Sequence, residues 1–99
     1  MKKVGLVGGI GPESTISYYH DIVYGVQKEV GRDFFPDVSI ESIALFKWVD
    51  LCDKKEYDKL ADYTMEPIER LARSGADFAV LTANTAHLIF DQVHSRSPI

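Results

Sequence analysis

The sequence predicts a three-layer α/β/α fold with a short parallel sheet, and three observations support this. Short apolar runs at residues 4–7 and 78–81 read as buried strands, and longer stretches between them carry apolar residues every three to four positions. Glycines stand where one pattern gives way to the next. Strands that alternate with helices imply a parallel sheet with helices on its faces. Ninety-nine residues suit one small domain, and we expect residues 1–99 to form a single unit.

The first strand is followed by a glycine loop at residues 8–14 and then by a helix. Pro12 suits the first helical turn, because its missing N–H is not needed there. Gly31 supplies a stop signal for this helix. Apolar residues at spacings of three and four predict one buried helix face, made of Ile16, Tyr19, Val23, Val26 and Val30.

The middle of the chain predicts a second strand, a loop and a second helix. The strand is expected within residues 38–45, the loop at 46–51 and the helix over 54–74. Pro67 lies inside that helical pattern, and we expect it to kink the helix or divide it.

A third strand and a third helix complete the predicted order. The continuous apolar run at 78–81 is typical of a strand covered on both faces. A turn at 82–85 leads into a helix expected over 86–94. Ligands on parallel sheets bind at the carboxyl ends of the strands, near helix N-termini. The glycine loop and the segment at 82–87 both fall at that end.

Composition and charge exclude several classes of protein. The hydrophobic fraction is 45% and the charged fraction 26%, as in ordinary soluble globular chains. No apolar run approaches the roughly 18 residues that a membrane span needs. The formal net charge of −4 argues against a nucleic-acid surface, which carries a basic patch. Cys52 is the only cysteine, so no intrachain disulfide can form, which is compatible with the cytoplasm.

The glycine loop is the first candidate site. Gly9 and Gly11 let the backbone come close to a ligand, and the following helix start offers free N–H donors, which suits a carboxylate or a phosphate. A tight turn without any ligand explains the same residues equally well. The loop is only a partial match to a dinucleotide fingerprint, because Ser14 stands where the third glycine is required.

Asn84 and Thr85 are the second candidate site. Both are ordinary helix N-caps, and their remaining donors could also hold a substrate carboxylate. His87 falls in the first turn of the predicted helix, where a neutral imidazole is favoured. We interpret it as a structural histidine.

Two separated motifs resemble the aspartate/glutamate racemase family. The first is Val-Gly-Leu-Val-Gly-Gly-Ile-Gly-Pro-Glu-Ser-Thr at residues 4–15, followed by Tyr18-Tyr19. The second combines Gly-Ala-Asp-Phe at 75–78 with Ala-Asn-Thr-Ala-His at 83–87. The resemblance implies half of a two-domain fold, with the substrate bound between two similar α/β domains. It also implies a cytoplasmic enzyme that needs no pyridoxal phosphate, other cofactor or metal and takes a small-molecule substrate, an acidic amino acid.

The family mechanism uses two cysteines as acid and base on opposite faces of the α-carbon. The first of these positions, immediately before Asn84, is occupied here by Ala83, and the second would lie beyond Ile99. Cys52 matches neither motif, so no catalytic residue is assigned with certainty. Family resemblance also suggests that Lys47 faces the side-chain carboxylate of the substrate. A solvated surface lysine is the alternative interpretation.

Three functions follow as hypotheses. The chain is expected to be a fragment of a racemase that interconverts L and D forms of aspartate, glutamate or a similar amino acid, inactive when isolated. Alternatively, it is a non-catalytic α/β module that binds a small anionic ligand or a nucleotide. A third possibility is a truncated protomer that persists by association. A homo-oligomer is expected in any case, since an uncovered sheet edge and face recruit partners.

Overall fold

A parallel three-stranded sheet forms the middle layer of the computed structural model, which describes residues 2–82 and 89–99. The central strand is β1 (Val4–Gly8), flanked by β2 (Val38–Ser42) and β3 (Phe78–Leu81) in the order β2-β1-β3. Leu6 is aligned with Ile40 on one side and with Val80 on the other, and both pairings are parallel. The predicted α/β class and its parallel sheet are confirmed.

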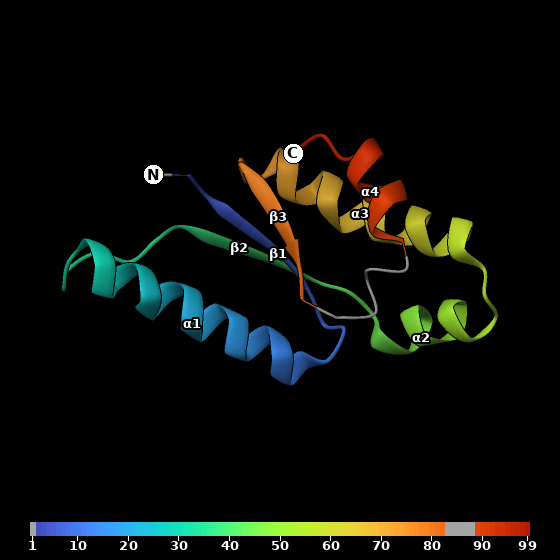
Figure 1. Cartoon of the computed structure of the whole chain (residues 1–99), viewed down its shortest axis with the longest axis horizontal. Helices are drawn as coiled ribbons and strands as arrows, with labels where there is room; N and C mark the ends of the chain where they lie inside the picture. Colours follow the sequence, from blue (N-terminus) through green and yellow to red (C-terminus); the bar gives the residue numbers. More distant parts are fainter. Residues whose placement is uncertain (1, 83–88) are drawn as a thin grey trace.

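Helices cover both faces of this sheet. Figure 1 shows α1 (Pro12–Val30) on one face and α3 (Tyr57–Arg73) with α4 (Phe90–Arg96) on the other. The chain passes from β1 to β2 and then returns to place β3 on the opposite side of β1. Because crossovers between parallel strands are right-handed, a reversal of direction along the sheet puts the connecting helices on opposite faces. The three layers therefore follow from the strand order.

Successive residues of β1 serve opposite faces of the sheet, as the pleat of a strand requires. A Cβ added to Gly5 would meet the side chain of Leu71 at 3.0 Å, so Gly5 faces α3. Val7 faces the same way and belongs to the core cluster there. Leu6 lies between them in sequence and points to the α1 side, where it is fully buried.

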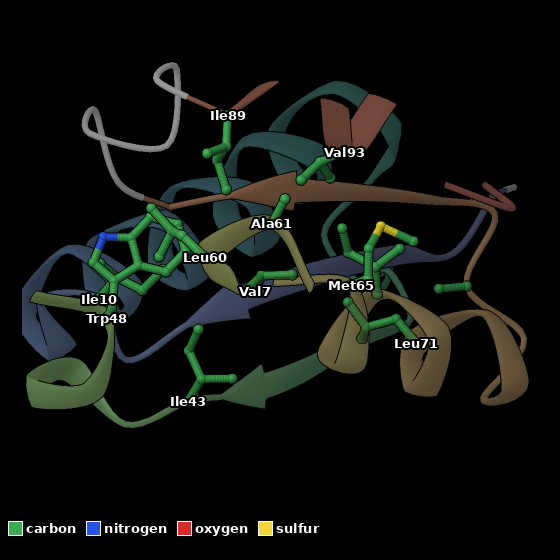
Figure 2. Packing of buried hydrophobic residues seen from close by; sticks show 12 residues of the cluster. Val7, Ile10, Ile43, Trp48, Leu60, Ala61, Met65, Leu71, Ile89 and Val93 are labelled. Atoms are coloured by element: carbon green, nitrogen blue, oxygen red, sulfur yellow. The ribbon is translucent and has the colours of Figure 1, made fainter. Parts of the chain in front are cut away.

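The main hydrophobic core lies between the sheet and α3. Figure 2 shows its side chains extending from Ile10 and Trp48, at the carboxyl ends of the strands, to Leu71 near the C-terminus of α3. The core cluster joins residues from every layer except α1: Val7, Ile10, Ile43, Trp48, Leu60, Ala61, Met65, Ile68, Leu71, Ala76, Ile89 and Val93. α3 supplies the largest share because its buried positions recur at helical spacing.

The segment after β2 differs from the sequence prediction. β2 ends at Ser42, and residues 46–51 belong to α2 (Leu45–Asp53) rather than to a loop. The Ile43 N–H still donates to the carbonyl of Gly8, and α2 begins two residues later. Trp48 is buried, and Leu45, Leu51 and Cys52 pack against the core cluster at helical spacing. That contact with the core stabilises a helix in this segment.

Pro67 neither divides nor ends the second predicted helix. α3 runs without interruption from Tyr57 to Arg73 with Pro67 inside it. The proline ring is fully buried, so its packing offsets the hydrogen bond that the missing N–H forfeits. The helix begins at Tyr57 rather than at residue 54, because Lys55 has a positive φ of 55° that separates α2 from α3.

The α1 side of the sheet is covered less completely than the sequence predicts. Of the five residues expected on the inner face of α1, Val23 is buried, whereas Ile16, Tyr19 and Val30 are 68%, 47% and 54% exposed. The prediction that residues 78–81 are covered on both faces is wrong, because none of the four residues of β3 is fully buried and Phe78 is 40% exposed. α1 is the one described helix on this face, and a single helix is too narrow to cover all three strands.

The last described helix is α4, which ends at Arg96 rather than at residue 94. The predicted start of this helix at residue 86 lies outside the described residues. Ile89 and Val93 anchor α4 to the core cluster. Among the helices of the described residues, none combines the length and the apolar character that crossing a membrane requires.

Candidate functional site

The carboxyl ends of β1 and β3 mark the candidate site. Strand order reverses between these two neighbours, because the chain leaves β1 first toward β2 and later returns to β3 on the other side. In open parallel sheets, ligands bind in the crevice at such a reversal. Figure 1 shows the loop after β1, the start of α1 and the end of β3 gathered at this end of the sheet.

The glycine loop after β1 needs glycine at two positions. Gly9 and Gly11 have φ of 83° and 79°, in the left-handed region that disfavours L side chains. Around Gly9 there is also no room, because an added Cβ would collide with the Ile43 carbonyl and lie 2.5 Å from the Ser42 hydroxyl. At Gly11 the nearest atom would be 3.5 Å away, so only the backbone conformation selects glycine there.

The N–H groups of this loop are not equally available. The Gly9 N–H donates to the Thr15 hydroxyl at 3.0 Å in a buried position. Within residues 2–82 and 89–99, no acceptor is hydrogen-bonded to the N–H of Gly11, Glu13 or Ser14. These donors point from the positive end of α1, where an anion is stabilised. The prediction that Gly9 binds substrate therefore rests on the backbone conformation of the loop, and the one for Gly11 also on an N–H that has no acceptor among the described residues.

A surface pocket of about 500 Å³ begins at the same helix end. Its described lining comes from one flank of α1: Glu13, Ser14, Ser17, Tyr18, Asp21 and Ile22. The lining therefore carries two carboxylates and three hydroxyl groups, of which Glu13 and Ser14 lie in the first turn, beside the N–H donors, and Asp21 lies about two turns further along α1. An arrangement that offers N–H donors and carboxylates side by side suits a ligand with both an anionic and a cationic group.

A buried pair of hydroxyl groups joins β3 to the glycine loop. The Oγ1 atoms of Thr15 and Thr82 lie 3.3 Å apart. Thr82 also donates its hydroxyl to the Val7 carbonyl at 3.0 Å, and its backbone N–H bonds the same carbonyl. Neither threonine was among the residues predicted from the sequence to form the site. Their signal is positional, since one lies in the first turn after the loop and the other directly follows a buried strand.

Lys47 lies on α2 rather than in a loop. Its ammonium nitrogen is 4.3 Å from the centroid of the Tyr63 ring, a cation–π contact. It lines a groove of about 310 Å³ between α2 and α3, together with Leu51, Lys59, Asp62, Tyr63 and Glu66. The described contacts of Lys47 thus belong to this groove, and a role in substrate binding stays a prediction.

Cys52 and Trp48 lie on the inner side of α2. Burial, and after it the negative charge of Asp53, raises the pKa of the Cys52 thiol. This disfavours the thiolate, consistent with the view that Cys52 does not replace a catalytic cysteine. The indole N–H of Trp48 is buried and has no acceptor within the described part of the chain. Figure 2 shows this ring beside Ile10 where the strands end.

The remaining predicted site residues, Asn84 and Thr85, lie outside the described residues, as does Ala83 in the position that the resemblance gives to a cysteine. Their roles stay predictions. The structure describes the chain up to Thr82, which is the last residue before this segment.

Comparison with protein families decides the assignment. The family model for Asp/Glu/hydantoin racemases matches residues 7–99, which is nearly the whole chain. The chain belongs to this family. A curated relative, the broad specificity amino-acid racemase RacX of Bacillus subtilis (strain 168), is 25% identical over 93 residues. That alignment covers 91% of this chain and 40% of RacX.

Solved structures agree with this membership. An Asp/Glu racemase candidate from Yersinia pestis superposes with a TM-score of 0.92 at 28% identity, over 96% of this chain and 41% of that one. PH1733 from Pyrococcus horikoshii OT3, an aspartate racemase homologue, gives a TM-score of 0.85 at 30% identity. Here the coverage is 100% of this chain and 43% of PH1733. The racemase-family chain therefore spans about two fifths of the length of these relatives.

Proposed function

We propose that this chain forms the N-terminal half of the substrate site of an amino-acid racemase acting on aspartate, glutamate or a similar acidic amino acid. The observation that carries the proposal is the glycine loop at the β1/β3 reversal, next to the N-terminus of α1, in a chain that matches the racemase family. Racemisation would proceed in the cytoplasm by removal and return of the α-proton without a cofactor.

The geometry suggests how an amino acid would be held. The N–H groups of Gly11, Glu13 and Ser14, which have no acceptor among the described residues, would bind the α-carboxylate at the N-terminus of α1. The carboxylate of Glu13 borders the same pocket and could pair with the α-ammonium. Lys47 would serve the side-chain carboxylate after leaving the Tyr63 ring, and Asn84 and Thr85 would add donors from the following loop.

A titration followed by amide NMR tests this proposal. L- or D-aspartate should shift the amide resonances of Gly11, Glu13 and Ser14 more than those of α3. Succinate, which has the two carboxylates but no ammonium, is the matched ligand and should bind more weakly if Glu13 pairs with the ammonium. Aspartate that shifts none of these three amides, even at high concentration, would contradict the proposed site.

The second candidate function is a non-catalytic module for a small anionic ligand or nucleotide. It is favoured by Ala83, which has no titratable group at the position where the family resemblance expects an acid or base. The same titration separates the two functions. A nucleotide that shifts Gly11 and Ser14 at lower concentration than either aspartate enantiomer would support the module instead.

Association with a second copy is also proposed. The α1 side of the sheet exposes Ile16, Tyr19, Val30, Ile40 and Phe78, and apolar surface of this kind recruits partners. Light scattering should give a mass above that of one chain, and the mass should fall on dilution. A constant monomer mass at high concentration would contradict this.

A further inference from the structure

We propose that Thr15 and Thr82 are positioning residues whose hydroxyl groups form a one-way hydrogen-bond relay between the glycine loop and the end of β3. The relay would run from the Gly9 N–H through both hydroxyls to the Val7 carbonyl. Its effect on substrate rests on the function proposed above, because it sets the relative position of the two segments assigned to the substrate.

The direction of the relay follows from the number of available protons. Each threonine hydroxyl has one proton to donate, and the Gly9 N–H can only donate. If Thr82 donates to Val7 at 3.0 Å, a bond between the two hydroxyls requires Thr15 as its donor, at 3.3 Å, in competition with the 3.4 Å bond from Thr15 to the Gly11 carbonyl. The reverse arrangement would give up the 3.0 Å bond and keep instead the 3.4 Å contact from Thr15 to the Gly11 carbonyl. The shorter set of bonds therefore favours the direction from Gly9 to Val7.

Burial makes this relay sensitive to any lost hydroxyl. Thr15 is 9% exposed and Thr82 is 2% exposed, so water cannot readily replace a missing partner. In a low-dielectric interior, chained hydrogen bonds polarise one another, and an unpaired group is costly. A change at Thr82 should therefore be felt at Gly9, although the two residues share no direct bond.

The relay connects three parts of the site that are distant in sequence. Thr15 lies in the first turn of α1, Gly9 in the glycine loop, and Thr82 directly after β3. Thr82 is held at the Val7 carbonyl by both its backbone N–H and its hydroxyl. The end of β3 at Thr82 is thereby connected to the loop that carries the N–H groups of Gly11 and Ser14.

The test uses the 99-residue chain and compares Thr82→Val, which removes the hydroxyl, with Thr82→Ser, which keeps it. The first readout needs no ligand: the chemical shift and hydrogen-exchange rate of the Gly9 amide. Thr82→Val should move the Gly9 resonance and speed its exchange by about three- to tenfold, the effect of one net hydrogen bond. Thr82→Ser should restore most of both. Thr15→Val removes the acceptor of the Gly9 N–H itself and should change the Gly9 amide in the same direction and by more.

Thr64→Val is the matched control. Thr64 is fully buried and donates its hydroxyl to the Leu60 carbonyl at 2.8 Å, within α3 and away from the glycine loop. It should lower stability like the other two variants and leave the Gly9 amide unchanged. If Thr82→Val leaves Gly9 as in the wild type, or if Thr82→Ser and Thr82→Val act alike, the relay is refuted.

The second readout is the affinity for L-aspartate. If the proposed function holds, Thr82→Val should weaken binding by about three- to tenfold, and Thr82→Ser and Thr64→Val should not. Unchanged affinity in Thr82→Val would refute the positioning role even if Gly9 moves. If the wild type binds no aspartate, the proposed function fails, whereas the relay is still decided by the Gly9 amide.

Discussion

The ammonium of Lys47 lies over the Tyr63 ring at 4.3 Å, and the hydroxyl of that same ring accepts the N–H of Ala44 at 3.0 Å. Tyr63 of α3 thus contacts both Ala44, the residue before α2, and Lys47 in the first turn of α2. Lys47 therefore has a defined position over the Tyr63 ring, and it would have to leave that ring to bind a substrate carboxylate.

Replacing Lys47 by methionine separates its two interpretations. If the ammonium binds the side-chain carboxylate of the substrate, Lys47→Met should weaken L-aspartate binding by about tenfold, because a charged hydrogen bond is lost. This loss is partly offset, since the cation–π contact with Tyr63 no longer has to be broken. Lys59→Met is the matched control, since Lys59 lines the same groove. Equal affinities of the two variants, measured by calorimetry, would make Lys47 an ordinary surface lysine.

Alanine substitutions at Gly9, Gly11 and Gly25 should differ in their effect on stability, because the space and the backbone conformation differ at the three positions. Gly9→Ala should prevent folding, since the new Cβ would collide with the Ile43 carbonyl. Gly11→Ala has room and should cost about 1–2 kcal/mol for the left-handed backbone. Gly25 lies inside α1 with no atom near its added Cβ, so Gly25→Ala should stabilise by about 0.5–1 kcal/mol. Urea unfolding measures the stability of Gly11→Ala and Gly25→Ala, and circular dichroism shows whether Gly9→Ala folds.

Two apolar residues near α1 should differ sharply in their contribution to stability. Leu6 is fully buried beneath this helix, and Leu6→Ala should lower the free energy of unfolding by about 2–5 kcal/mol. Ile16 is 68% exposed, and Ile16→Ala should change it by less than about 0.5 kcal/mol. A large loss in Ile16→Ala at low protein concentration would show that the α1 face is covered in solution.

The raised pKa of Cys52 predicts slow alkylation of the folded chain. The thiolate is the reactive species, so iodoacetamide at pH 8 should react more slowly with the folded chain than with the urea-unfolded chain. As pH rises through the ordinary thiol pKa, the unfolded chain ionises first, and stability should fall slightly in that window. Asp53→Asn should speed alkylation by removing the nearby charge. A rate–pH profile identical in both states would contradict this.

The isolated 99-residue chain should not racemise aspartate or glutamate. Ala83 offers no acid or base, and loss of one such group is typically worth about a hundredfold to ten-thousandfold in rate. Ala83→Cys alone should not restore activity, because the opposite face of the α-carbon would still lack a partner. Exchange of the α-hydrogen with deuterated solvent, followed for both enantiomers, measures this. Enzyme-dependent exchange by the unmodified chain would mean that the catalytic groups lie elsewhere.

The strands, α1 and the glycine loop could be predicted because their signals are local. An apolar run leading into Gly8, and Pro12 placed to begin a helix, needed no knowledge of distant residues. α2 was missed because Phe46 and Val49, 84% and 39% exposed, blur the helical spacing of its buried residues.

The burial of the α1 residues against the sheet and the contacts between distant residues could not be predicted in the same way. The apolar stripe of α1 was visible in the sequence, but which of its residues a sheet covers depends on where that sheet ends. The contact between Thr15 and Thr82 joins residues 67 positions apart. No spacing rule connects two such threonines, and only the strand order brings them together.

The central position of β1 has a consequence for synthesis of the chain. β1 is synthesised before both of its partners, because it pairs on one side with residues 38–42 and on the other with residues 78–81. One of its edges therefore stays open until residues 78–81 have been made. Unpaired edges of nascent strands invite misassembly. A chaperone that shields the first strand during translation should increase the yield of folded protein more than one added after release.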